Sequence, residues 1–265
     1  MRRSRDDPRM GSTTVVLGPG LAVAGALAVV VAAALAAMAH LGTGRSTVIA
    51  GARAALQLGA VSLLIGAIVG SVLLSAAFVL VMVAVAAWTS ARRITPHRSG
   101  WWALLPVTLA PLPVTTLLVL GGVVPPVGVA VIPMAGILIG GTMTATSLAG
   151  RRTLDELTAR HGEVEAALSL GLLPRDARME IARPTAAQAL VPALDQTRTV
   201  GLVTLPGAFV GMLLGGASPV QAGAVQVLVL VLLLAVETVA VAVVLELVCR
   251  GVVVRPDGDP GGRSR

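Results

Sequence analysis

Long apolar runs follow one another along almost the whole chain, and this succession constrains the fold more than any other feature. Seven runs can be distinguished, at residues 20–41, 47–70, 71–89, 101–120, 127–148, 199–214 and 220–248. A helix of about 20 apolar residues spans about 30 Å of hydrocarbon. Only 12% of the residues are charged, whereas soluble domains carry about 25%. We therefore predict an all-α, polytopic membrane protein with about seven transmembrane helices.

The polar segments predict the domain organisation. Residues 1–18 and 251–265 are expected to be disordered tails, and residues 19–250 a single transmembrane domain. The arginines beside the apolar runs place the long polar loop, residues 150–195, in the cytoplasm between spans five and six. In this arrangement the arginine-rich N-terminal tail lies outside, against the positive-inside rule. Two other span counts are therefore possible. Six spans would remain if the first run is a signal peptide cleaved near 37–39, and eight would result if residues 185–195 dip into the membrane.

The basic residues exclude a P-loop ATPase and argue against nucleic-acid binding. All 20 are arginines. A P-loop ATPase needs a lysine at the end of its Gly-rich loop to bind the phosphates of ATP. We therefore expect no cofactor in this chain and no enzyme activity, with any ATP bound by a partner subunit. Aromatic residues make up only 2% of the chain, so the arginines indicate membrane topology and a lipid bilayer partner, not nucleic acid.

The long polar loop has a helical pattern with sharp breaks. Apolar residues recur at helical spacing over 151–170, and Glu156 and Arg160 are placed for an i,i+4 ion pair. Gly171 is expected to stop this helix, Pro174 to begin a second one, and Pro184 to end it. A short charged helix between two breaks forms a protrusion suited to a partner's groove. The alternative is an amphipathic loop that lies on the membrane surface.

Several polar residues in or near the spans are candidates for a transport pathway. Asp195 and Arg198 form an i,i+3 pair at the entry of the sixth span, and Arg53 and Gln57 lie one turn apart in the second. Glu237 lies midway along the last span, too far from either end to reach water. An ionisable residue there is a candidate proton or cation site, although a protonated, hydrogen-bonded structural role is equally open.

Interrupted helices are a second pathway signal. Pro133 with Gly136, and Pro206 with Gly207, resemble the broken helices that transporters place near the membrane midplane. Glycines at four-residue spacing, at 136–140 and 207–215, predict close helix packing. The three histidines and the single cysteine do not cluster, so we expect no metal site, and no motif of an intramembrane protease is present.

The polar loop resembles the "EAA" loop by which permease subunits of ABC transporters dock onto their ATPase subunit. The matching positions are Glu165, Ala166, Ala167, Gly171, Ile181 and Pro184. The expected ATPase-coupling loop also includes Leu168, Pro174, Arg175 and Arg178. Five further stretches resemble the FetB family of bacterial ABC permeases, which are implicated in iron export and have plant relatives in aluminium tolerance. They are residues 53–58 (RAALQL), 132–136 (IPMAG), 168–171 (LSLG), 195–207 (DQTRTVGLVTLPG), and 218–222 (SPVQA) with Gln226.

This resemblance implies a multi-pass permease of the bacterial plasma (inner) membrane. It would pair with a separate FetA-like ATPase subunit, form a homodimer, and export iron or another metal ion or small solute. Two rival hypotheses stay open. One is a proton-coupled secondary transporter that uses Glu237, and the other is a membrane scaffold that transports nothing.

Overall fold

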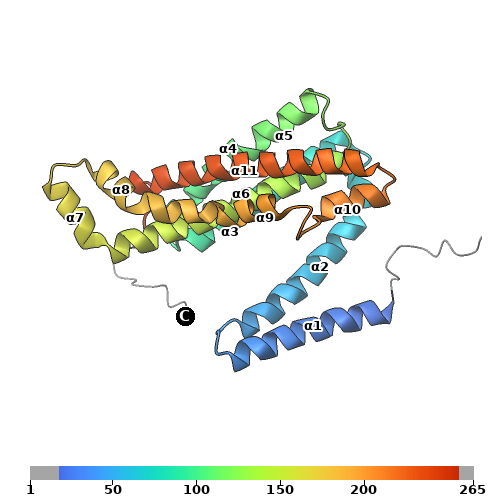
Figure 1. Cartoon of the computed structure of the whole chain (residues 1–265), viewed down its shortest axis with the longest axis horizontal. Helices are drawn as coiled ribbons and strands as arrows, with labels where there is room; N and C mark the ends of the chain where they lie inside the picture. Colours follow the sequence, from blue (N-terminus) through green and yellow to red (C-terminus); the bar gives the residue numbers. More distant parts are fainter. Residues whose placement is uncertain (1–17, 257–265) are drawn as a thin grey trace, which may run out of the picture. The chain divides into compact units, whose positions relative to one another are not determined.

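The computed structural model describes residues 18–256, which are helical almost throughout (Figure 1). Six helical segments are long and apolar enough to cross a membrane: Pro19–Met38, Gly44–Gly66, Val72–Ile94, Arg98–Leu120, Gly128–Ala159 and Pro219–Cys249. The predicted polytopic, all-α fold is confirmed. The tails predicted at 1–18 and 251–265 lie largely outside the described residues.

The described residues up to Ala67 form one compact unit, which is a helical hairpin. The helices α1 (Pro19–Met38) and α2 (Gly44–Ile68) join through a short turn in which Gly42 has a φ of +69°. Gly51 brings the helices close together, because a Cβ there would lie 2.8 Å from a methyl carbon of Val29. The hairpin leaves most of its apolar side chains exposed, which suits contact with lipid or with other helices.

Residues 68–265 form the second unit, which is organised around the long helix α6 (Gly128–Ala159). Along its length α6 packs against α3 (Val72–Ile94) and α11 (Pro219–Cys249), and it also contacts α8 (Pro174–Ala187) (Figure 1). The remaining elements are η1 (Arg98–Ala103), α4 (Leu104–Leu109), α5 (Pro111–Leu120), α7 (His161–Ser169), η2 (Gln188–Leu190), α9 (Val191–Thr199) and α10 (Gly207–Leu214).

Small residues allow α6 and α11 to pack closely. A Cβ on Gly141 of α6 would lie 2.3 Å from Leu233 Cδ1 and 2.5 Å from Glu237 Oε1, both on α11. The predicted close approach at residues 136–140 is only half right. Gly136 does face Met82 of α3, but a Cβ on Gly140 would meet nothing within 4 Å.

The helices α6 and α11 point toward the same end of the second unit, which fixes the path between them. The C-terminus of α6 leads into α7 and α8, and the last turns of α11 also contact α8. The intervening chain must therefore return along the unit, and it does so through α9, residues 200–206 and α10 (Figure 1). The prediction of one sixth span over 199–214 is wrong as a continuous helix. The described residues therefore contain six candidate spans, one fewer than the seven predicted, with an interrupted segment in place of the sixth predicted span.

Candidate functional site

The polar loop begins with a bend at Arg160, which the sequence did not reveal. The predicted helix over 151–170 is two helices, because α6 ends at Ala159 and α7 begins at His161. The predicted pair is present, with 3.2 Å between Arg160 Nη1 and Glu156 Oε1, and Arg160 also hydrogen-bonds Glu163 in the first turn of α7. These hydrogen bonds lower the pKa of Glu163 and raise the pKa of Arg160. The ion pairs thus join the two helices across the bend.

The predicted break at Gly171 is confirmed, and it has the geometry of a Schellman motif. Gly171 has a φ of +93°, a left-handed conformation that strains any residue with a Cβ. Its N–H donates to the carbonyl of Leu168, and the N–H of Leu172 donates to the carbonyl of Ala167. Pro174 then occupies the first turn of α8, where a missing N–H costs nothing.

Pro184 does not end α8, so this prediction was wrong. The helix continues to Ala187 with Pro184 inside it. Ala182 and Ala186, which flank the proline, are completely buried in a core cluster with residues of α6 and α11. Tertiary packing therefore overrides the local penalty of a proline, whose own side chain is exposed.

The two loop helices pack on each other and leave an apolar tip. Val164 of α7 clusters with Ala177 and Ile181 of α8, so the predicted coupling residue Ile181 is buried between the two helices. Four leucines at the turn between the helices are exposed, with Leu170 82% exposed. They are Leu168, Leu170, Leu172 and Leu173. Glu165 and Ala166 are exposed on α7, and Ala167 is half-buried. Exposed leucines on a charged protrusion are typical of a docking surface.

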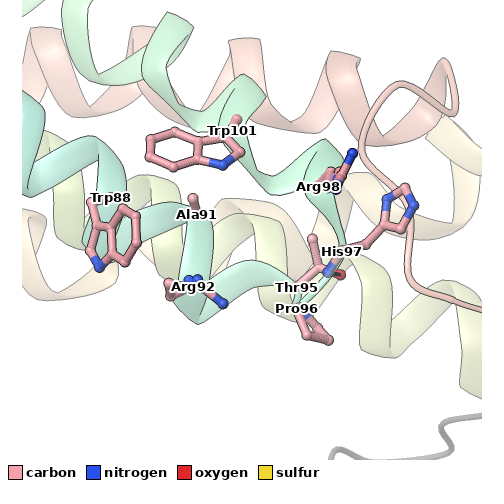
Figure 2. A pocket seen from close by; sticks show the side chains of 8 residues that line it. All are labelled: Trp88, Ala91, Arg92, Thr95, Pro96, His97, Arg98 and Trp101. Atoms are coloured by element: carbon pink, nitrogen blue, oxygen red, sulfur yellow. Dashed lines mark hydrogen bonds between the residues drawn. The ribbon is translucent and has the colours of Figure 1, made fainter.

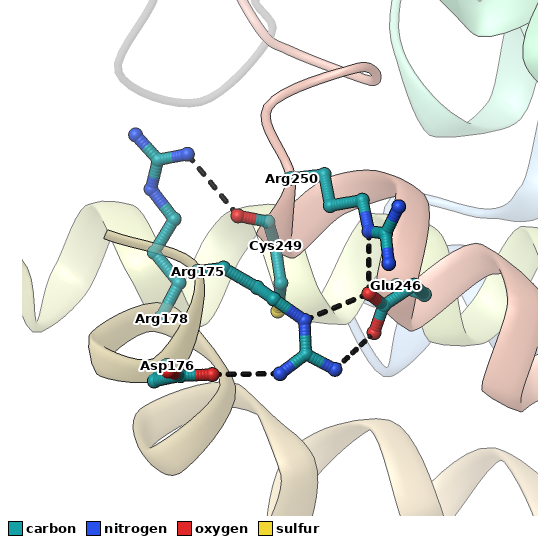
Figure 3. Close-up of polar contacts among 6 residues, drawn as sticks. All are labelled: Arg175, Asp176, Arg178, Glu246, Cys249 and Arg250. Atoms are coloured by element: carbon teal, nitrogen blue, oxygen red, sulfur yellow. Dashed lines mark hydrogen bonds and ion pairs between the residues drawn. The ribbon is translucent and has the colours of Figure 1, made fainter. Parts of the chain in front are cut away.

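Arginines of α8 hold the end of α11 (Figure 3). Arg175 donates two hydrogen bonds to Glu246, with both N···O distances 2.7 Å, and a third to Asp176. Arg250 donates to the same Glu246 carboxylate, at 2.6 Å. Arg178 donates to the backbone carbonyl of Cys249, at 3.2 Å. The bonds to Glu246 and Asp176 raise the pKa of Arg175.

Sequence reasoning passed over Glu246, although it is the carboxylate on which this cluster depends. The local signal was its i,i+4 spacing to Arg250, which gave no hint of a partner on α8. Two predicted coupling residues, Arg175 and Arg178, are thus brought to the end of a long helix. A bidentate arginine–carboxylate pair is geometrically specific, so it can transmit a displacement of α8 to α11.

Polar side chains are enclosed between the long helices. Glu237 is only 7% exposed and lies against Gly141 of α6. On the same face of α11, about three turns nearer its start, Gln226 has a buried Oε1 with no hydrogen-bond partner among the described residues. Thr146 of α6 has a buried hydroxyl in the same condition. The predicted interruption at Pro133 and Gly136 is wrong, because α6 continues through both residues; Pro133 is exposed and Gly136 is partly buried.

The other pathway candidates are distributed over two places. Asp195 and Arg198 are both exposed on α9 and pair with each other at 3.6 Å, not with Glu237. Arg53 and Gln57 are exposed on α2 of the hairpin unit. No group of three or more His, Cys, Asp or Glu that could hold a metal ion occurs in the part of the chain that the structure describes.

The stretch 199–207 interrupts the return segment. Gly201 has a φ of +82°, and its N–H donates to the carbonyl of Thr204, at 2.9 Å. Helix α10 starts only at Gly207, after the extended Pro206. A non-helical turn thus lies between two short helices, as transporters have near their substrate sites. The predicted interruption at Pro206 and Gly207 is therefore present, and it is longer than a kink.

Comparison with known proteins assigns the chain to a family. A family model described as "Uncharacterised protein family (UPF0014)" matches residues 20–253. The rice UPF0014 membrane protein STAR2 is 36% identical over 212 residues, which are 78% of this chain and 74% of that protein. No solved structure matches the chain.

Two further relatives match over shorter stretches. Protein ALUMINUM SENSITIVE 3 of Arabidopsis thaliana is 38% identical over 151 residues, 57% of this chain and 55% of that protein. The "Probable iron export permease protein FetB" of Escherichia coli (strain K12) is 34% identical over 112 residues, 42% of this chain and 43% of that protein. The resemblance to FetB-type permeases is confirmed, and the chain belongs to the UPF0014 family of membrane proteins.

Proposed function

We propose that this protein is the permease subunit of an ABC transporter of the bacterial inner membrane. It would work as a homodimer with a separate, FetA-like ATPase subunit that binds the ATP, so the chain itself needs no cofactor. The proposal rests on two properties that the α7–α8 segment combines: an exposed apolar tip and a firm attachment to the long helices. Its leucine tip is exposed, while α8 is joined to α11 by Arg175 and Glu246.

In the proposed mechanism, the ATPase subunit binds the exposed tip formed by α7 and α8. ATP binding draws two ATPase subunits together, and α8 moves with the subunit that it contacts. Because Ala182 and Ala186 are packed into the core and Arg175 holds Glu246, α8 carries α6 and α11 along. The enclosed polar groups between these two helices would then face alternate sides of the membrane.

The homodimer is supported by the interrupted return segment. Non-helical backbone at membrane depth is tolerated only where protein or a water-filled cavity covers it. Residues 201–205 are exposed, with Leu202 91% exposed. A second copy that faces this segment would cover its backbone and create a pathway along the dimer axis.

The proposed domain organisation is one transmembrane permease domain, residues 19–250, flanked by polar tails.

The proposed substrate is iron, or another metal ion or small solute, exported from the cell. Support for iron comes from the relative in Escherichia coli whose name gives iron export. Neither the hairpin nor the α6–α11 interface shows a ligand cluster in its described residues. The pathway would therefore pass the ion without the dense ligand set of a storage site.

The test pairs two glycines of the same loop. Gly171→Arg places a Cβ at a φ of +93° in the tip, whereas Gly162→Arg adds the same charge in α7 where nothing lies within 4 Å. In cells that also express the FetA-like ATPase, Gly171→Arg should abolish both co-purification of the ATPase and ATP-driven accumulation of ferrous iron in inverted vesicles. Gly162→Arg should preserve both. Normal association and transport with Gly171→Arg would refute the proposal.

A second candidate function rests on the buried position of Glu237 against Gly141. A carboxyl there could carry protons for a secondary transporter. In that case a proton gradient alone would drive transport in proteoliposomes without the ATPase, and Glu237→Gln would abolish it. Transport that requires ATP and the ATPase, and that persists in Glu237→Gln, would exclude this second function.

A further inference from the structure

A cavity of about 280 Å³ lies where α3 ends and η1 begins (Figure 2). Its lining combines two tryptophans with three basic side chains: Trp88, Trp101, Arg92, Arg98 and His97. No carboxylate lines it. The ring centroids of Trp88 and Trp101 are 5.3 Å apart in an edge-to-face arrangement. In Figure 2 the two rings lie at one end of the cavity, and His97 with Arg98 at the other.

The hydrogen-bond donors of this cavity are not used by the rest of the protein. Neither Arg92 nor Arg98 forms an ion pair with a carboxylate of residues 18–256. Arg92 lies over the ring of Trp88, 4.9 Å from its centroid, an interaction that leaves its N–H groups free to donate. His97 Nδ1 lies 2.9 Å from Ser99 Oγ and accepts the backbone N–H of Ser99; in the tautomer with Nδ1 as acceptor, Nε2 carries the ring's N–H.

The cavity is held in shape by the chain that follows α11. Thr95 Oγ1 and Ser99 Oγ both donate to the carbonyl of Val254, at 3.1 and 3.2 Å, and the N–H of Val254 donates back to Ser99 Oγ. Val253 is buried. The loop that carries His97 and Arg98 is thus fixed on its outer side. Donors that are fixed in advance lose little entropy when they bind an anion.

The location points to the source of that anion. Trp88 and Arg92 lie in the last two turns of the apolar helix α3, and Trp101 begins the next candidate span. Tryptophans at both ends of such segments lie at the level of lipid head groups. The cavity is also at the same end of the unit as α8 and the end of α11, the end predicted to be cytoplasmic. The cytoplasmic leaflet carries anionic lipids.

We propose that this cavity binds the phosphate of an anionic phospholipid, with Arg92, Arg98 and His97 as donors and the two tryptophans against the glycerol and upper chain. The site is independent of the proposed transport function, since it needs neither the ATPase nor a substrate. It would anchor the start of α4 to the lipid surface while α8 moves. A bound lipid would then stabilise the junction between α3 and η1.

The experiment uses tryptophan fluorescence of the full chain in nanodiscs. Trp102→Phe leaves Trp88 and Trp101 as the only tryptophans. Phosphatidylglycerol with brominated chains is titrated into phosphatidylcholine, and brominated phosphatidylcholine is titrated in parallel. Brominated phosphatidylglycerol should quench the tryptophan fluorescence at a several-fold lower mole fraction than brominated phosphatidylcholine does. Each of Arg92→Gln and Arg98→Gln should reduce this preference about fivefold, since one arginine near an anionic lipid surface contributes about 1 kcal/mol.

The matched control is Arg93→Gln, which removes the same charge from the neighbouring residue of α3 but does not line the cavity. It should keep the preference. All three arginines are exposed, so the variants should fold, and gel filtration checks this. Equal quenching by both lipids, or an equal loss with Arg93→Gln, would overturn the proposal. Relief of quenching by millimolar inorganic phosphate would assign the cavity to a free anion and would overturn the lipid as its ligand.

Discussion

The α7–α8 segment and the segment of α9, residues 200–206 and α10 follow each other in the chain, yet they are held in opposite ways. The first is polar, but α8 buries five residues and forms ion pairs with the end of α11. The second is apolar, but α10 buries none. Contacts within the chain thus fix the segment that we assign to the partner ATPase. The interrupted segment depends on its surroundings, because its open backbone needs cover inside a membrane.

The largest difference between the two segments should appear when a buried alanine of α8 is enlarged. Ala186→Leu forces a side chain into a position that is completely buried, and it should lower the free energy of unfolding by about 1–3 kcal/mol. Gly211→Leu in α10, where nothing lies within 4 Å of a Cβ, should not lower it. Denaturation in detergent, followed by gel filtration, measures both.

The neighbouring residue supplies the control for that prediction. Ala187 lies next in α8 and is exposed, so Ala187→Leu should leave stability unchanged. An equal loss from Ala186→Leu and Ala187→Leu would show that α8 is not packed on the bundle.

The second prediction removes the ion pair without disturbing the core. Arg175→Gln and Glu246→Gln should each reduce ATP-driven transport several-fold while the ATPase still co-purifies, because the tip is intact but α8 no longer holds α11. The double variant should be about as impaired as Glu246→Gln alone, because both single variants remove the Arg175–Glu246 pair and Glu246→Gln also removes the contact with Arg250.

Arg183→Gln is the control for this cycle, as Arg183 is exposed on the same helix and forms no ion pair with another described residue. It should transport normally. Additive losses in the double variant would mean that Arg175 and Glu246 act separately.

A third prediction separates the two segments by partner. Leu202→Gln, on the interrupted segment, should change the stability of the detergent-solubilised chain by less than about 0.5 kcal/mol, because the side chain is exposed. It should nevertheless weaken cross-linking between two copies in the membrane. Leu170→Gln, at the tip, should do the reverse and reduce ATPase binding with cross-linking unchanged. If each variant affected both partners, the segments would not have separate roles.

The smallest effect concerns the bend at Arg160. The pKa of Glu163 is lowered in the folded protein by the hydrogen bonds from Arg160, so the stabilisation is present above the ordinary carboxylate pKa. It is lost as the pH falls through the lowered folded value. The protection of backbone amides at the start of α7 against hydrogen exchange, corrected for the intrinsic pH dependence of exchange, should therefore fall only in acid. Glu163→Gln should remove this dependence, and Glu165→Gln should keep it; identical profiles for all three proteins would contradict this.

The features that the sequence predicted correctly are those that depend on near neighbours in the chain. Span-length apolar runs, the Gly171 break with Pro174 after it, and the Glu156–Arg160 pair all follow from spacing within a few residues. The pairing of Arg175 with Glu246 joins residues 71 positions apart, and no periodicity encodes it. Pro184 shows the converse, because burial of its neighbours outweighs its local preference.

The faces of the spans were equally hard to predict. A helix that is apolar on all sides gives no signal as to which side meets another helix. For that reason the four-residue glycine spacing favoured Gly140, whereas Gly141 is the residue that meets α11. The return segment was predicted as one span because nearly all its residues are apolar, but left-handed Gly201 and extended Pro206 leave residues 200–206 without a continuous helix.

The lengths of α6 and α11, 32 and 31 residues, have a consequence for the medium in which coupling takes place. At 1.5 Å per residue each helix is more than 45 Å long, about 15 Å more than the hydrocarbon layer. Arg175 and Glu246, at the end of α11 beside the polar loop, are both partly exposed, so counter-ions in the surrounding water can reach their contact. Raising the ionic strength should therefore weaken the coupling between α8 and α11. The buried packing of Gly141 against Leu233 should not respond to salt.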